Sequence, residues 1–241
     1  MALTPTGVFS RPNFKLRSML AQCATVQGLL RASSAAAALA LILDEAVSGE
    51  AARPFIYVTS PEDSPQPLAG GTRTYYKPHG RLSAHIEVPQ IWTGAVTQIF
   101  NEGEFYDTSL IGHADDFFAG LLTKFTSGAL SGDHQTVLTL DGATGLLNHE
   151  NDFDSAPQVG DEYILEPASE ADAHIFFKNL LGAIRSEMLD LSGLGTTDAL
   201  DPDSKGHLSI QSIRIADWGE SLDDKEDERF FGAQIEVEFG I

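Results

Sequence analysis

Clusters of histidine and acidic residues are the parts of this sequence whose residue types and spacing suggest chemistry. His113-Ala-Asp-Asp116 combines an imidazole with two carboxylates, groups that bind metal ions and transfer protons. Residues 148–154 alternate oxygen-bearing side chains in the manner of a calcium-binding loop. An EF-hand loop counted from Asn148 requires a glycine and a glutamate, however, where this chain has Phe153 and Val159. We therefore expect no calcium at residues 148–154, and we expect residues 113–116 to form a solvated turn.

The most acidic stretch, residues 217–228, contains seven carboxylates and one lysine. The carboxylates belong to Asp217, Glu220, Asp223, Asp224, Glu226, Asp227 and Glu228. Such a run is usually the solvated tip of a hairpin. The functional alternative is a surface that lines a channel for DNA or contacts an assembly partner. An acidic lining repels phosphate groups, and an acidic tip attracts a basic neighbour. These seven residues are the candidate channel or partner interface.

The sequence carries no recognised catalytic or cofactor-binding motif. Glycine-rich phosphate and dinucleotide loops, the serine nucleophile elbow and the H-E-x-x-H zinc motif are missing. The seven histidines are scattered, without metal-ligand spacing. The single cysteine, Cys23, lies on an apolar helical stripe and is expected in a core, and one cysteine cannot form an internal disulfide. We predict a protein that is not an enzyme and has no catalytic residues, cofactor or metal.

The charge of the chain is strongly negative and unevenly distributed. The net charge of −20 disfavours binding to the outside of a nucleic acid, which requires lysine and arginine to neutralise phosphates. Residues 1–91 have a net charge of +2, residues 92–166 of −12, and residues 167–241 of −10. The sharp change near residue 92 indicates a boundary between two structural units.

Two helices are predicted near the start of the chain. Over residues 13–31, apolar residues recur at spacings of three and four and form one stripe, with Asn13 as the expected N-cap. The second helix is predicted from about Ser34, its N-cap, to Val47, with Gly49 ending it. The longest apolar run, residues 35–43, is too short to cross a bilayer.

Strands are predicted to follow these helices at residues 55–59, 72–77 and 81–88, with residues 60–71 as a loop. The strand at 81–88 alternates, which indicates one buried face and one wet face. Its expected inward residues are Leu82, Ala84, Ile86 and Val88.

The last third of the chain predicts one helix and two strands. Ser169 and Asp172 form a capping-box pattern, and Gly193 is the expected helix stop. The expected apolar face of this helix consists of Ile175, Phe176, Leu180, Leu181, Ile184 and Met188. Strands are expected at 208–215, with a bulge at Gln211-Ser212, and at 231–239. Residues 1–91 and 167–241 therefore predict an α+β body: a mostly antiparallel sheet covered by helices on one face.

Residues 92–166 have a different pattern. Short β-type runs separated by turn signals replace helical periodicity, apart from a possible turn at 114–119, and Asp141-Gly142 is a strong hairpin turn. The pattern predicts an inserted small all-β module, a barrel or a sandwich, between a strand end and a helix start.

The body resembles a known protein family. The segments FFKNLLGAIRSEMLDLSG (176–193), HLSIQSIRI (207–215) and FFGAQIEVEFGI (230–241), with RPFIYVTS (53–60) and GRLSAHIEVP (80–89), resemble tail terminator proteins of long-tailed bacteriophages. The resemblance covers about two thirds of the chain. Within 92–166, the segments FTSGALSG, DGATG and APQVGDEYIL resemble a small β module that recurs in phage virion proteins, although typical terminators lack such an insert.

The resemblance implies a structural role without catalytic residues or a cofactor. Family members form a ring, usually of six subunits, that caps the tail tube and joins it to the head. The implied partners are copies of the chain itself, the tail tube protein, the head–tail connector or neck protein, and DNA that passes through the lumen without specific binding. The implied location is the tail or neck of a virion, assembled in the host cytoplasm.

Two alternatives remain open at this point. One is another neck or tail-completion protein. The other is a virion module that binds the host surface through exposed aromatic residues. The aromatic candidates, which could instead fill the core of the insert, are Trp92, Phe105, Tyr106, Phe117 and Phe118.

Overall fold

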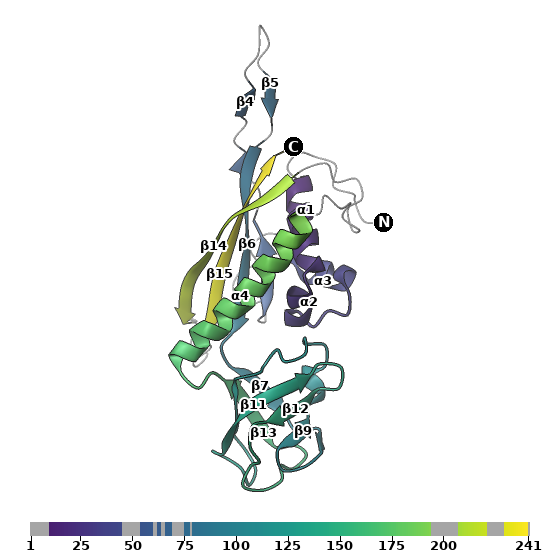
Figure 1. Ribbon diagram of the computed structural model, residues 1–241, viewed down its shortest axis with the longest axis vertical. Coiled ribbons are helices and arrows are strands. Elements are labelled where there is room, and N and C mark those ends of the chain that lie inside the picture. The colour runs from purple at the N-terminus through teal and green to yellow at the C-terminus, as the bar shows by residue number, and fades with distance from the viewer. Residues whose placement is uncertain are drawn as a thin grey trace.

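The computed structural model describes residues 10–44, 54–59, 62–63, 66–68, 75–77, 79–193, 207–220 and 229–240. It contains helices and antiparallel sheets, which confirms the predicted α+β class. The molecule is elongated (Figure 1). A helix-covered sheet, here called the body, occupies its centre. Residues 92–166, here called the module, lie at one end, and the paired strands β4 (Gln66–Leu68) and β5 (Tyr75–Lys77) lie at the other.

The body is built on one sheet with the strand order β1-β2-β6-β15-β14. The strands are β1 (Leu43–Asp44), β2 (Phe55–Val58), β6 (His79–Pro89), β15 (Arg229–Gly240) and β14 (His207–Glu220). Neighbours are antiparallel except for β1 and β2, and β3 (Glu62–Asp63) also pairs with β6. The helices lie on one face of this sheet (Figure 1).

The core of the body forms where the apolar faces of the strands meet the helices. The alternation predicted for β6 is confirmed, because Leu82, Ala84, Ile86 and Val88 are all buried. In the neighbouring β15, the buried residues are Phe231, Ala233, Ile235 and Val237. Because side chains of a strand alternate between faces, both strands present one apolar face to the helices.

The first predicted helix is two helices. α1 (Ser10–Gln22) and α2 (Ala24–Leu29) are separated at Cys23, whose backbone is extended. A tertiary contact explains the break, because the Glu187 carboxylate from α4 (Glu170–Gly193) accepts hydrogen bonds from the backbone N–H of Thr25 and supplies the cap of α2. Asn13 is not an N-cap. It lies within α1, buried, and its amide donates to the Thr59 carbonyl oxygen.

The third helix, α3 (Ala35–Leu41), begins as predicted and ends early. The Ser34 hydroxyl accepts a hydrogen bond from the Ala37 backbone N–H, which confirms the predicted cap. The predicted end at Val47 is wrong, because Ile42 is extended and the next two residues form β1. Gly49 lies outside the described residues. Residues 60–71 were predicted to form a loop. This prediction is wrong for the described residues of that range, which form the short strands β3 and β4.

The long helix α4 (Glu170–Gly193) begins and ends where predicted. The Ser169 hydroxyl accepts from the Asp172 backbone N–H at 3.2 Å. Its buried stripe differs from the expected one, because Phe177 faces the sheet and stacks on Phe231 with ring centroids 4.9 Å apart. Ile175, predicted on the buried face, is 55% exposed.

The module contains a seven-stranded antiparallel sheet with the order β7-β13-β10-β11-β12-β9-β8. The strands are β7 (Trp92–Ala95), β8 (Gln98–Ile99), β9 (Glu104–Tyr106), β10 (Leu122–Phe125), β11 (His134–Asp141), β12 (Leu146–His149) and β13 (Glu162–Glu166). A 3-10 turn, η1 (Thr108–Leu110), follows β9. The sheet surrounds its own apolar cluster, which includes Phe105, Phe118, Phe125 and Tyr163. That the module folds independently as an inserted domain stays a prediction.

The hairpin of β14 and β15 confirms one local prediction and corrects another. The pairing register shifts between Ile210 and Ser212, where the bulge was expected. β14 continues to Glu220, so Asp217 and Glu220 are strand residues and do not belong to a hairpin tip. A second register shift between Ile215 and Asp217 accommodates this longer strand.

Candidate functional site at the junction of body and module

Two of the seven acidic residues predicted as an interface lie in the part of the chain that the structure describes. Asp217 and Glu220 lie in β14, and Asp223, Asp224, Glu226, Asp227 and Glu228 lie outside the described residues. Glu220 is paired with Arg229, and Phe230 is paired with Pro89, the last residue of β6. Since β6 leads directly into the module, Asp217 and Glu220 lie at the module end of the body sheet.

The carboxylates at 113–116 do not converge with the histidine. His113 is buried and its Nδ1–H donates to the Gly28 carbonyl oxygen at 2.9 Å. Asp115 accepts from the Gly142 backbone N–H, and Asp116 accepts from the Leu140 backbone N–H. Among the described residues, no three or more histidine, cysteine or acidic side chains come together in a way that could hold a metal ion. This holds for residues 113–116 and for residues 148–154.

The module contains a buried carboxylate, Asp107, that no sequence motif indicated. Asp107 is 1% exposed and accepts three hydrogen bonds, from the Ala95 N–H (3.0 Å), the Ser109 N–H (2.7 Å) and the Tyr163 hydroxyl (2.6 Å). Burial, and secondly the negative charge of Asp107, raise the pKa of Tyr163. A Cβ at Gly94 would collide with this pair, so only glycine fits there. The network is enclosed and holds β7, β13 and η1 together.

A second enclosed pair, Thr123 and His149, resembles a nucleophile and its base but is structural. The His149 Nδ1–H donates to the Gly103 carbonyl at 2.8 Å, so Nε2 is free to accept from the Thr123 hydroxyl at 2.8 Å. Both residues are buried, at 0% and 5% exposure, which denies a substrate access. Burial lowers the pKa of His149 to about 4, so the ring is neutral at physiological pH.

The module contacts the body through the loop at 111–118. Besides the bond between His113 and Gly28, the Arg31 Nε–H donates to the Ile111 carbonyl at 3.4 Å. The Phe117 ring lies edge-on to Phe176 of α4, with centroids 5.9 Å apart. Trp92 and Phe117 are half-buried and pack against the cores of both units. These contacts link the two apolar cores across the junction.

The DGATG turn at 141–145 supports this loop from the module side. The Gly112 N–H donates to the Gly142 carbonyl, and the Asp107 N–H donates to the Gly145 carbonyl, both at 2.9 Å. A Cβ at Gly142 would collide with the His113 carbonyl oxygen. Gly145 has φ +73, a conformation that glycine adopts without strain. The turn that the Asp141-Gly142 pair predicted therefore also supports the junction.

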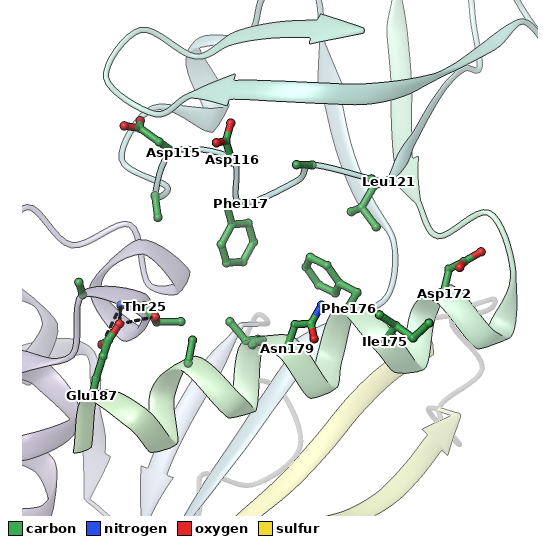
Figure 2. Close-up of a pocket in the computed structure, with 16 residues that line it drawn as sticks. Thr25, Asp115, Asp116, Phe117, Leu121, Asp172, Ile175, Phe176, Asn179 and Glu187 are labelled. Atoms are coloured by element: carbon green, nitrogen blue, oxygen red, sulfur yellow. Dashed lines mark hydrogen bonds between the residues drawn. The ribbon is translucent and has the colours of Figure 1, made fainter. Parts of the chain in front are cut away.

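A groove with a volume of ≈ 610 Å³ lies between the module loop and α4 (Figure 2). Its apolar lining includes Phe117 and Leu121 on the module side and Ile175 and Phe176 on α4. Its acidic lining consists of Asp115, Asp116, Asp172 and Glu187. One end reaches α2, where the Glu187 carboxylate accepts from the Thr25 hydroxyl at 2.6 Å.

Cys23 and the aromatic candidates for surface binding serve packing. Burial, and secondly the Glu187 carboxylate, raise the pKa of the Cys23 thiol far above its usual value, so the thiol stays protonated and is a poor nucleophile. Phe105 and Phe118 are buried in the module core, and Tyr106 is half-buried.

Comparison of the sequence with protein-family models and with curated proteins finds no match. Within the ranges that the structure describes, no helix combines the length and apolar character needed to cross a membrane.

Two glycine-to-alanine changes should have opposite effects on stability. A Cβ at Gly28 would lie 2.8 Å from the Ala114 backbone nitrogen, so Gly28→Ala must displace the module loop. We expect a loss of about 1–3 kcal/mol in the free energy of unfolding. A Cβ at Gly182 in α4 meets no atom within 4 Å. Gly182→Ala should therefore stabilise by about 0.5–1 kcal/mol through helix propensity. Urea unfolding of both variants measures the difference, and stabilisation by Gly28→Ala would contradict the packed junction.

Proposed function

We propose that this protein is a structural subunit of a tailed-phage virion, the ring that terminates the tail tube and joins it to the head or neck. The observation that supports this role is the arrangement of the chain. A helix-covered sheet carries a paired-strand projection at one end and a β module at the other (Figure 1). Such a subunit has separate surfaces for neighbours around a ring and along its axis. Its enclosed ionisable groups, Asp107, His113 and His149, bind neighbouring parts of the same fold.

The first proposed partners are further copies of the chain, whose negatively charged modules do not gather at the axis of the ring. Six modules with a net charge of −12 each repel one another, and a channel for duplex DNA about 20 Å wide leaves no room for them. We therefore place the module at the outer rim. The tail tube protein and the connector or neck protein bind the two faces of the ring, and DNA passes through without specific contacts.

The position of Asp217 and Glu220 supports one of the two roles considered for the acidic residues. Both lie where β14 ends at the module end of the body sheet, so an outward module favours contact with a partner over lining of the channel. An acidic tip steers docking onto a basic face, and salt weakens that attraction. In this proposal the seven acidic residues form a partner interface.

A cryo-electron microscopy reconstruction of the purified full-length protein tests this proposal. We expect a closed ring with a central hole, the modules at its periphery and residues 217–228 away from the channel wall. A mass measurement by light scattering provides the subunit number. A protein that remains monomeric at all concentrations, or a ring with the modules at its axis, would overturn the proposal.

The alternative of a host-surface-binding module requires exposed aromatic side chains. Phe105 and Phe118 lie in the core, and Trp92 and Phe117 pack at the junction, so four of the five residues first considered for this role are engaged in packing. Another neck or tail-completion role would produce the same fold, and the position of the ring in purified virions distinguishes it.

A further inference from the structure

We propose that the groove between α4 and residues 114–121 binds a peptide segment of a partner protein. The segment carries lysine or arginine side chains around one large apolar side chain. The groove lies within one subunit, so this inference goes beyond the proposed ring and does not depend on it.

The apolar part of this site is gathered on both walls of the groove. α4 directs Phe177 to the body core, which leaves Ile175 and Phe176 toward the groove. Ile175 is 55% exposed although it is a large apolar residue. Phe117 and Leu121 approach from the opposite wall (Figure 2). Single exposed apolar residues are common, but a cluster across a groove provides an anchor position for an incoming side chain.

The charged part of the site is uniformly negative. Four carboxylates line the groove, from Asp115, Asp116, Asp172 and Glu187, and no lysine or arginine lines it. Their hydrogen-bond donors are backbone N–H groups and the hydroxyls of serine and threonine, all of them neutral. Within the described part of the chain, none of the four forms an ion pair. The negative potential is therefore not neutralised and favours a cationic ligand.

The length of the groove identifies a peptide as the occupant. Its lining follows α4 from Asp172 to Glu187, which spans about 22 Å at 1.5 Å per helical residue. An extended chain covers that distance in about seven residues at roughly 3.3 Å each. Small-molecule ligands are usually enclosed on most sides. This groove instead runs between a helix and a loop that belong to different units (Figure 2).

Fluorescence polarisation with the full-length protein tests the proposal. The probe is a fluorescein-labelled peptide of lysine and serine residues with one central phenylalanine. We expect saturable binding that weakens with added salt. Two comparison peptides, one with glutamate for lysine and one with serine for phenylalanine, should bind at least about tenfold more weakly, because each lacks one of the two recognition features.

A matched pair of variants separates the groove from general attraction to an acidic protein. Ile175→Lys changes the groove, whereas Leu189→Lys makes the same change at a second exposed position of α4, 41% exposed and outside the groove lining. We expect Ile175→Lys to weaken binding at least about tenfold and Leu189→Lys to leave it nearly unchanged. Equal losses, or no saturable binding by the unmodified protein, would overturn the inference.

A photo-reactive phenylalanine at the centre of the same peptide provides a second readout. Cross-links should map to residues 115–121 and 172–187, and cross-links elsewhere would contradict the site. Ring formation is measured separately by light scattering. A ring that does not bind the peptide would therefore refute the groove alone, and a monomer that does bind it would refute the ring alone.

Discussion

Asp107→Ala should destabilise the protein by about 3–5 kcal/mol, because the change leaves three donors in the module interior without an acceptor. Two of them are the backbone N–H groups of Ala95 and Ser109, and the third is the Tyr163 hydroxyl. Asparagine cannot replace the carboxylate, since its amide nitrogen would face a donor on one side. Urea unfolding followed by the fluorescence of Trp92, which packs against the module core, measures the loss.

Two control variants make this result specific. Tyr163→Phe removes one donor and leaves the carboxylate two partners, so a smaller loss of about 1–2 kcal/mol is expected. Asp152 is exposed and its carboxylate accepts no hydrogen bond from the described residues. Asp152→Ala should therefore leave the unfolding midpoint close to that of the unmodified protein. If Asp107→Ala behaved like Asp152→Ala, the buried network would not contribute to stability.

Acid should destabilise the protein between about pH 6.5 and pH 4, through two buried histidines. Burial lowers the pKa of both His113 and His149 to about 4, and the nearby charge of Arg31 adds to the effect at His113. In this range the unfolded chain binds protons at these positions and the folded chain does not. Stability is therefore complete above pH 6.5 and falls as the pH approaches 4. Each histidine contributes a loss of about 3 kcal/mol.

Urea unfolding at a series of pH values tests this expectation. His149→Gln should reduce the slope of stability against pH by the contribution of one group, even if it lowers stability at every pH. A stability that stays constant from pH 6.5 to pH 4 would contradict the buried, neutral state of both rings.

Local signals predicted much of the body. The alternation of β6, the hydroxyl caps of α3 and α4 and the bulge in β14 each depend on residues that are neighbours in sequence. Long-range contacts caused the errors. The helix break at Cys23 depends on Glu187, whose carboxylate accepts from the Thr25 N–H at the start of α2 although the two residues are 162 positions apart. The rotation of α4 was ambiguous because Phe176 and Phe177 are both aromatic, and only the sheet selects between them.

The site was less predictable than the fold. The buried role of Asp107 depends on Tyr163, 56 positions away, so a lone aspartate before a turn gave no signal. The groove combines residues of α2, the module loop and α4, which no single motif connects. Ile175 was the one sequence signal for the groove. Three consecutive apolar residues, 175–177, cannot all lie on one buried face of a helix, so one of them is left exposed. The acidic residues were visible in the sequence, but the position of Asp217 and Glu220 at the module end of the body sheet follows only from strand register.

The strand register of the body sheet also determines the order in which the chain can fold during synthesis. β6 lies between β2 and β15, and Ser83 and Gln234, whose side chains are hydrogen-bonded, are 151 positions apart. Every strand pair of the module, in contrast, joins residues within 92–166. A nascent chain can therefore complete the module sheet while one edge of β6 still lacks its partner. Until β15 leaves the ribosome, that edge is open to pairing with other chains, so β15 is the strand that protects this edge of the sheet from aggregation.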